Sequence, residues 1–241
     1  MAQDEFDMAS LADRLNAVRT AIGAAAAQAG RQAGDVRLIA ISKTWSADVI
    51  RAAAGLGQSD FGESKIQEAL AKIGPLAPLG LAWHFIGHLQ ANKAKSIPGN
   101  FAWLHSLDSV ELAARLERLL TERDASLNAL IEINLSGDPR RHGIAPNQLA
   151  EFIESLALTR FNRLHLRGLM GMAPWPAPES EQRAAFARLR ALRDDCAQRF
   201  GLGDFTELSM GMSDDFVPAI LEGATMIRVG TAIFGDRSQI R

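Results

Sequence analysis

The chain has 241 residues, a formal net charge of −2, 47% hydrophobic residues and 22% charged residues. This is an ordinary globular balance, and the length suits one α/β barrel. The nearly neutral charge gives no reason to expect a nucleic-acid partner, because such domains usually carry a basic face. No apolar run approaches the roughly 20 residues that cross a bilayer, and the acidic N-terminal segment lacks the apolar core of a signal peptide. We therefore expect a cytoplasmic protein with no membrane partner.

The expected elements begin with a helix. Ser10 is a suitable N-cap, apolar residues recur at three- and four-residue steps before an Ala-rich run to Ala29, and Gly30 would end the helix. Short apolar runs then predict eight strands, at 37–42, 60–62, 84–87, 103–106, 129–134, 166–170, 206–209 and 226–230. Helical patterns lie between them, at 47–55, 64–73, 109–123, 146–158, 179–200 and 214–222.

Eight strands, each followed by a helix or a loop, indicate one closed parallel (β/α)8 barrel with an extra N-terminal helix. No change in composition divides the chain, so we expect a single domain over residues 1–241. The alternative is a doubly wound open sheet, which usually has a Gly-rich turn after its first strand. Here the first strand continues directly into Ser42, Lys43 and Thr44, which favours the barrel.

Lys43 stands where the first strand ends, on the face of a barrel that usually carries the active site. Burial there would favour the neutral amine that a Schiff base with an aldehyde requires. The alternative is an ordinary lysine extending from a strand end into solvent, and the position alone favours that alternative. The sequence has five lysines, of which Lys65, Lys72 and Lys95 are expected at the surface of helices.

A second group of residues follows the last two strands. Barrels often hold a phosphate between these two loops, where backbone N–H groups converge. Gly230 would permit close approach, and Ser209 and Thr231 would add hydroxyl donors. The alternative is a pair of turns that need glycine only for their geometry, and the two interpretations are about equally supported.

Arg228 is a single charge in an otherwise apolar strand. Because side chains alternate along a strand, it shares a face with Met226 and Gly230. It could therefore face a ligand at the barrel mouth, or it could form a salt bridge across the barrel. His84 begins a strand and is expected to be a core histidine with its hydrogen bonds satisfied. The single cysteine, Cys196, excludes an intramolecular disulfide, and no metal-ligand spacing is present, so we expect no metal site.

Taken together, these segments resemble the pyridoxal phosphate homeostasis protein family, whose barrel is similar to the N-terminal domain of alanine racemase. The matching stretches are 40–44, 61–63, 84–87 with 89–90 and 92–93, 208–213, and 228–235. They occur in the right order over nearly the whole chain. One departure is the pair Ser64 and Lys65, where the family usually has Asn and Tyr.

The resemblance implies that pyridoxal 5′-phosphate (PLP) is held as a Schiff base on Lys43. It implies that Ser209, Gly230 and Thr231 hold the phosphate, with Met210 beside the cofactor. Arg228 matches the arginine that faces the pyridine nitrogen, where a permanent positive charge would keep the nitrogen unprotonated. The implied role is PLP homeostasis without efficient turnover. We expect a monomer whose partners are PLP and PLP-dependent apoenzymes.

The alternative is a PLP-dependent amino-acid racemase or a related enzyme. Racemisation needs a proton donor or acceptor on each face of the substrate carbanion. In the racemase relatives the second group is a tyrosine from an additional C-terminal domain. This chain contains no Tyr and ends soon after its eighth barrel unit. We therefore expect a carrier with no catalytic residues, rather than an enzyme.

Overall fold

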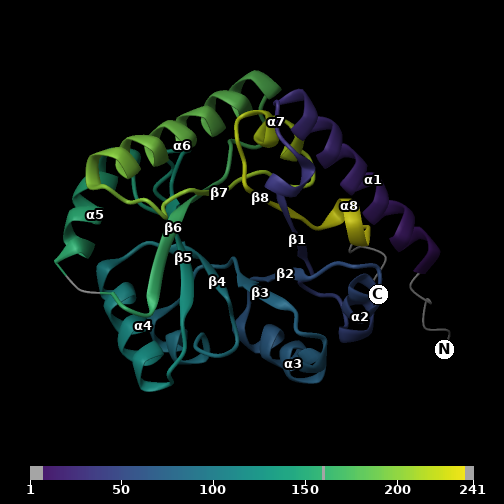
Figure 1. The fold of residues 1–241 in the computed structure, drawn as a ribbon, viewed down its shortest axis with the longest axis horizontal. Coiled ribbons are helices and arrows are strands. Elements are labelled where there is room, and N and C mark those ends of the chain that lie inside the picture. Colours follow the sequence, from purple (N-terminus) through teal and green to yellow (C-terminus); the bar gives the residue numbers. More distant parts are fainter. Residues whose placement is uncertain (1–7, 159–160, 237–241) are drawn as a thin grey trace.

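The structure is a computed structural model that describes residues 8–158 and 161–236. Eight parallel strands pair in chain order, and β8 closes on β1 to complete a barrel, as the sequence predicted (Figure 1). The strands are β1 Arg37–Ile41, β2 Asp60–Glu63, β3 Ala82–Phe85, β4 Trp103–Leu107, β5 Leu127–Ile133, β6 Leu164–Gly171, β7 Glu207–Ser209 and β8 Met226–Val229.

Helices surround this barrel. The α-helices are α1 Met8–Gln28, α2 Ala47–Gly55, α3 Ile66–Leu76, α4 Val110–Glu122, α5 Leu149–Ala157, α6 Glu179–Phe200, α7 Phe216–Leu221 and α8 Thr231–Phe234. Short 3-10 helices are η1 Ala33–Asp35, η2 Ala77–Leu79, η3 Ala91–Ser96 and η4 Pro146–Gln148. Within the described residues, no helix is both long enough and apolar enough to span a membrane.

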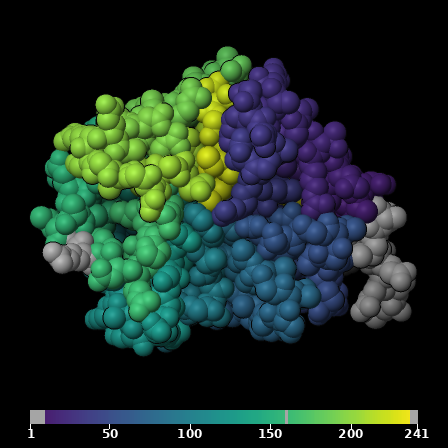
Figure 2. All heavy atoms as spheres, in the orientation of Figure 1, coloured from purple at the N-terminus to yellow at the C-terminus, as the bar shows by residue number. Residues whose placement is uncertain are grey.

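The extra N-terminal helix is present. It packs against α7 and α8, so α7 lies between α1 and α6 (Figure 1). In Figure 2 the yellow C-terminal segment is visible between the purple and green helices. Ser10 lies inside α1 and not at its N-cap, because the described helix already begins at Met8. Leu11, Leu15 and Ile22 form the buried stripe that docks this helix on the barrel.

Local sequence signals explain several element boundaries. Ser46 and Ser109 cap α2 and α4, each accepting a hydrogen bond from the backbone N–H three residues on. The predicted helix at 214–222 is shorter in the structure, where α7 runs from Phe216 to Leu221; Pro218 lies in its first turn, where a backbone N–H has no intrahelical partner to lose. The sequence did not predict α8, a single turn that begins at Thr231 directly after Gly230.

Gly168 is required by the packing of β6 against β7. Its φ is +152°, and a Cβ atom at this position would lie 1.9 Å from the carbonyl oxygen of Glu207. The pairing of β5 with β6 shifts register just before it, between Ala129 and Leu130. Only glycine allows the two backbones to approach this closely.

The barrel interior is only partly apolar. Ile39, Ile41, Trp103, Leu130, Met170 and Met226 form a small cluster inside it, separate from the larger core between strands and helices. The interior also contains His84, His105, Ser209 and Arg228, all buried. Branched apolar side chains dominate most barrels of this type, so this polar content needs an explanation.

Candidate functional site

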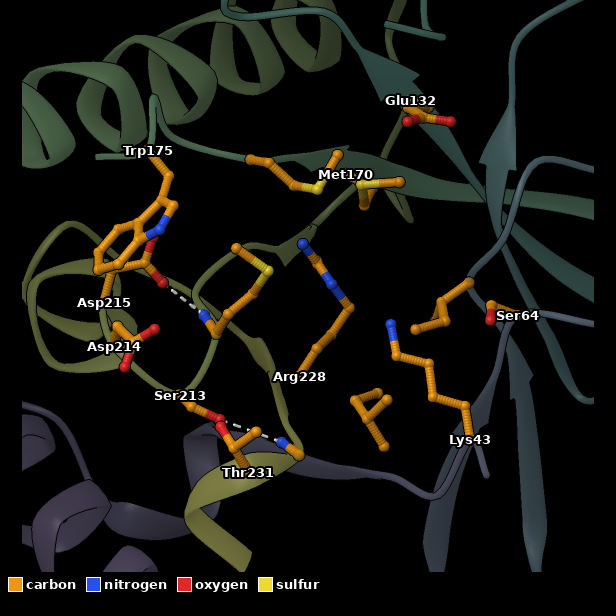
Figure 3. A pocket seen from close by; sticks show the side chains of 15 residues that line it. Lys43, Ser64, Glu132, Met170, Trp175, Ser213, Asp214, Asp215, Arg228 and Thr231 are labelled. Carbon is orange, nitrogen blue, oxygen red and sulfur yellow. Dashed lines mark hydrogen bonds between the residues drawn. The ribbon is translucent and has the colours of Figure 1, made fainter. Parts of the chain in front are cut away.

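A pocket of about 320 Å³ lies at the carboxyl ends of the strands, within the usual size range for small-molecule sites. Figure 3 shows Lys43 and Arg228 both reaching into it. The pocket is lined by Ile41, Lys43, Ser64, Ile86, Glu132, Met170, Met172, Trp175, Met212, Ser213, Asp214, Asp215, Arg228, Gly230 and Thr231. Four of the six predicted site residues therefore meet here, namely Lys43, Arg228, Gly230 and Thr231.

Lys43 follows the last residues of β1, and its side chain is directed into the pocket (Figure 3). The chain turns sharply just after it. Thr44 has a φ of +74°, an unusual conformation for a residue other than glycine, and its backbone N–H donates to the Glu68 carboxylate. This anchored turn fixes the direction in which Lys43 leaves the strand.

Lys72 is not a surface residue, so that prediction was wrong. Its Nζ donates to the carbonyl of Ser42 at 2.9 Å, to Glu63 at 2.8 Å and to Glu68 at 2.7 Å. The Ser42 hydroxyl donates to Glu63 at 2.6 Å. Burial raises the pKa of Glu63 despite its hydrogen bonds from Lys72 and Ser42. This buried network supports the strand end that carries Lys43.

A group of hydrogen-bond donors lies at the end of the pocket formed by the loop after β8. Ser213 Oγ accepts hydrogen bonds from the backbone N–H groups of Gly230, at 3.2 Å, and Ala232, at 3.4 Å. Thr231 starts α8 and also lines the pocket (Figure 3). The Ser213 and Thr231 hydroxyls therefore line the pocket beside these N–H groups, and an anion that replaced Ser213 Oγ as their acceptor would be held there.

Ser209 and Met210 do not lie among the residues that line the pocket, although the sequence predicted both as cofactor contacts. Both are fully buried. The Ser209 hydroxyl is already occupied, since Arg228 donates to it at 2.6 Å and His105 Nδ1 lies 2.8 Å away. The serine that reaches the pocket from this loop is Ser213, four residues later.

Arg228 is only 5% exposed. Its Nη1 donates to Ser209, and its Nη2 donates to the carbonyl of Gly171 at 3.2 Å. Burial lowers the pKa of Arg228 to about 10, which still leaves the guanidinium charged at neutral pH. Within residues 8–158 and 161–236 it forms no direct ion pair, so the structure does not support a salt bridge across the barrel.

Glu132 also lines the pocket, and the sequence analysis did not single it out. Burial, together with the nearby charge of Asp108, raises the pKa of Glu132 to about 7. This carboxyl group therefore changes charge near neutral pH, beside the charged Arg228. A glutamate at the end of an apolar strand could have been noted as unusual, but nothing in the sequence indicated its neighbours.

His84 is a core histidine with both ring nitrogens in hydrogen-bond contact, as the sequence predicted. His105, which the sequence analysis passed over, lies against it inside the barrel.

His88, Asp108 and His142 form a separate cluster, in which the atoms that could bind a metal lie within 4.8 Å of one another. The rings of His88 and His142 are stacked at an angle of 7°, so their in-plane lone pairs do not converge on one point. We assign no metal to this group.

Comparisons with known proteins identify the family. The family model for the alanine racemase N-terminal domain matches residues 14–238. The pyridoxal phosphate homeostasis protein of Pseudomonas aeruginosa is 44% identical, over 95% of this chain and 97% of the relative. The protein of the same name from Escherichia coli is 42% identical, over 95% and 98%. The chain belongs to the pyridoxal phosphate homeostasis protein family. The resemblance inferred from the sequence motifs is thereby confirmed.

The solved structure of a relative shows the same fold. PipY of Synechococcus elongatus, whose structure has PLP bound, is 38% identical to this chain. The two structures superpose with a TM-score of 0.83, over 93% of this chain and all of that one. In this protein, Ser64 lines the pocket and Lys65 precedes α3.

Proposed function

We propose that this protein binds PLP through a Schiff base on Lys43 and holds the cofactor in reserve without turning over a substrate. The observation that carries the proposal is the direction of the Lys43 side chain, which enters a pocket whose other end gathers anion-binding groups. The bound PLP in PipY, a relative with the same fold, supports it.

The residues present fit the chemistry of PLP, which has a flat ring, an aldehyde, a ring nitrogen and a phosphate. The hydroxyls of Ser213 and Thr231 would hold the phosphate, which would also replace Ser213 Oγ as the acceptor of the Gly230 N–H. Lys43 would supply the amine for the aldehyde, and the condensation releases one water molecule. Arg228 would face the ring nitrogen. The apolar walls are provided by Ile41, Ile86, Met170, Met172 and Met212.

The same residues argue against efficient catalysis. Bound PLP can stabilise a carbanion as an electron sink, most effectively when its ring nitrogen is protonated. The charged Arg228 would keep that nitrogen unprotonated. Racemisation would further need a second acid or base opposite Lys43, and the sequence contains no Tyr. We therefore propose a carrier with no catalytic residues.

Borohydride reduction followed by peptide mass spectrometry tests the attachment. We expect the pyridoxyl group on Lys43, and we expect Lys43→Ala to lose the visible Schiff-base absorbance band. Lys65→Ala is the matched control, because it removes a lysine outside the pocket and should keep the band. Label recovered on Lys65 or Lys93 would refute the assignment.

Incubation with L-alanine in deuterated water tests the absence of turnover. We expect slow exchange of the α-proton with retained chirality, because Lys43 alone can reach only one face. D-alanine formed at about 1 per second or faster would be typical of an enzyme and would contradict the carrier proposal.

We further propose that PLP-dependent apoenzymes in the cytoplasm are the partners, and that the carrier is a monomer. The homeostasis function of the named relatives supports this choice of partners. Mixing the PLP-loaded protein with an apo-aminotransferase should restore the activity of that enzyme faster than free PLP in solution does. Light scattering should give the mass of one chain.

A further inference from the structure

A continuous row of hydrogen bonds crosses the barrel interior and ends at Arg228. Asp60 Oδ1 lies 3.0 Å from His84 Nε2, and His84 Nδ1 lies 2.9 Å from His105 Nε2. His105 Nδ1 lies 2.8 Å from Ser209 Oγ, which accepts from Arg228 at 2.6 Å. Asp60 begins β2, whereas Arg228 reaches the pocket at the other end of the barrel. The row therefore links the two faces of the molecule.

Burying so many polar groups would be costly if any of them lacked a partner. His84, His105 and Ser209 are all fully buried, yet each side-chain nitrogen or oxygen has a partner in the row. The rings are also held by packing. His84 stacks on Trp103 with ring centroids 5.8 Å apart and planes 4° from parallel, and Arg37 lies over the same tryptophan.

The chemistry of the two ends gives the row a direction. A guanidinium only donates hydrogen bonds, and a carboxylate only accepts them. Arg228 must therefore donate to Ser209, and Asp60 must accept from His84 Nε2. If both histidines are neutral, His84 Nδ1 accepts from His105 Nε2, and His105 Nδ1 accepts from the Ser209 hydroxyl. Every hydrogen bond then points from the arginine towards the carboxylate.

The surroundings favour neutral rings. Burial lowers the pKa of His84, and it lowers the pKa of His105 well below its usual value. Burial by itself would raise the pKa of Asp60, but hydrogen bonds from His84 and Ser59 outweigh it and keep this group ionised. Arg37 lies 3.7 Å from Asp60 and adds a second positive charge at that face. At the pocket end, the negative charges of Asp215 and Glu132 raise the pKa of Arg228 and so partly offset the effect of its burial.

We propose that Asp60, His84, His105 and Ser209 are positioning residues, forming one oriented relay that holds the Arg228 guanidinium at the pocket and connects its charge to a carboxylate on the opposite face. The relay fixes where the guanidinium stands, because Ser209 is its nearest hydrogen-bond acceptor. Its effect on the cofactor rests on the proposed function, since Arg228 is expected to face the PLP ring nitrogen.

The direction of the relay is tested on the ligand-free protein by nitrogen NMR of ¹⁵N-labelled histidine. We expect both His84 and His105 to be neutral with the proton on Nε2 at pH 7. Asp60→Asn replaces an obligate acceptor by an amide that can also donate, so the variant should show mixed tautomers. Glu207→Gln is the control, because Glu207 also begins a strand and bonds to Thr225 outside the relay.

Two results would overturn the direction. One is a protonated His105, or one with its proton on Nδ1, in the unmodified protein. The other is an unchanged tautomer pattern in Asp60→Asn.

The link to Arg228 is tested by Ser209→Ala against Ser106→Ala. Both changes remove a buried serine hydroxyl with a 2.6 Å hydrogen bond, but Ser106 bonds to the Gly87 carbonyl outside the relay. In Ser209→Ala we expect the guanidinium N–H groups of Arg228 to exchange with solvent at least about tenfold faster. We also expect PLP affinity to fall about tenfold, with a shifted visible absorbance band. Ser106→Ala should change none of these.

Equal exchange rates in the two serine variants would overturn the proposal. Equal PLP affinities of the two variants would also overturn it, provided that the unmodified protein binds PLP. Failure of the unmodified protein to bind PLP would refute the proposed function instead, while the tautomer and exchange measurements would still decide whether the relay exists. Circular dichroism on each variant establishes that it is folded, so that a loss of affinity can be attributed to the relay.

Discussion

Replacing Glu132 by Gln should stabilise the protein at neutral and basic pH. Burial and the charge of Asp108 raise the pKa of Glu132 from 4.5 to about 7. The folded protein therefore binds this proton more tightly than the unfolded chain does. Stability from this group is fully present below pH 4.5 and is lost as the pH rises through 7. A shift of about 2.5 units corresponds to roughly 3 kcal/mol of unfolding free energy.

Gln has nearly the shape of the protonated glutamic acid and does not titrate in this range. The difference in unfolding free energy between Glu132→Gln and the unmodified protein should therefore be close to zero at pH 4.5. It should grow to about 3 kcal/mol above pH 7. Other titrating groups are present in both proteins, so they cancel to a first approximation. The difference reports the titration of Glu132 together with its charge interactions with Asp108 and Arg228.

Urea unfolding of the ligand-free protein between pH 4.5 and 8.5 measures this difference. Glu122→Gln is the matched control, because this glutamate is exposed on α4 and pairs with the exposed Arg118. Its effect should stay within about 0.5 kcal/mol at every pH. A flat difference for Glu132→Gln over the same range would refute the reasoning, since it would mean that this carboxyl group titrates alike in both states.

Three further changes test other parts of the structure. Lys72→Met should destabilise the fold by about 3–5 kcal/mol in urea unfolding, because it leaves Glu63 buried without its cation, and adding Glu63→Gln should recover part of the loss. Gly168→Ala should cost more than about 4 kcal/mol or prevent folding, since its Cβ would meet the Glu207 backbone. Ser213→Ala should weaken PLP binding roughly tenfold in a spectroscopic titration, whereas unchanged affinity would place the phosphate elsewhere.

The barrel could be predicted from the sequence because its strands are short apolar runs with clear caps and stops between them. The exact ends were harder. Residues 82–83 belong to β3 although the prediction began at His84, and β6 starts at Leu164, two residues before the predicted strand. In both cases the extra residues gain backbone partners from neighbouring strands, which a single sequence does not reveal.

The pocket was predictable for a different reason. Residues just after parallel strands meet at one face, so Lys43, Gly230 and Thr231 had to lie near one another once the barrel was assumed. The choice between Ser209 and Ser213 could not be made in this way. Ser209 ends β7 and points inward beneath Arg228, whereas Ser213 lies beyond the three residues 210–212, whose path depends on tertiary contacts. Lys72 was missed although Glu68 stands four residues before it, because that spacing is also common on exposed helices.

The relay shows most clearly what a single sequence withholds. Its members come from β2, β3, β4, β7 and β8, and each alone has an ordinary explanation. The pairing of His84 with Trp103 sets His105 two residues further along β4, on the same inward face. Gly62 pairs with His84 on the other side, and a Cβ there would lie 2.5 Å from Ile41. The row of polar contacts therefore follows from the strand registers together, which explains why no local pattern indicated it.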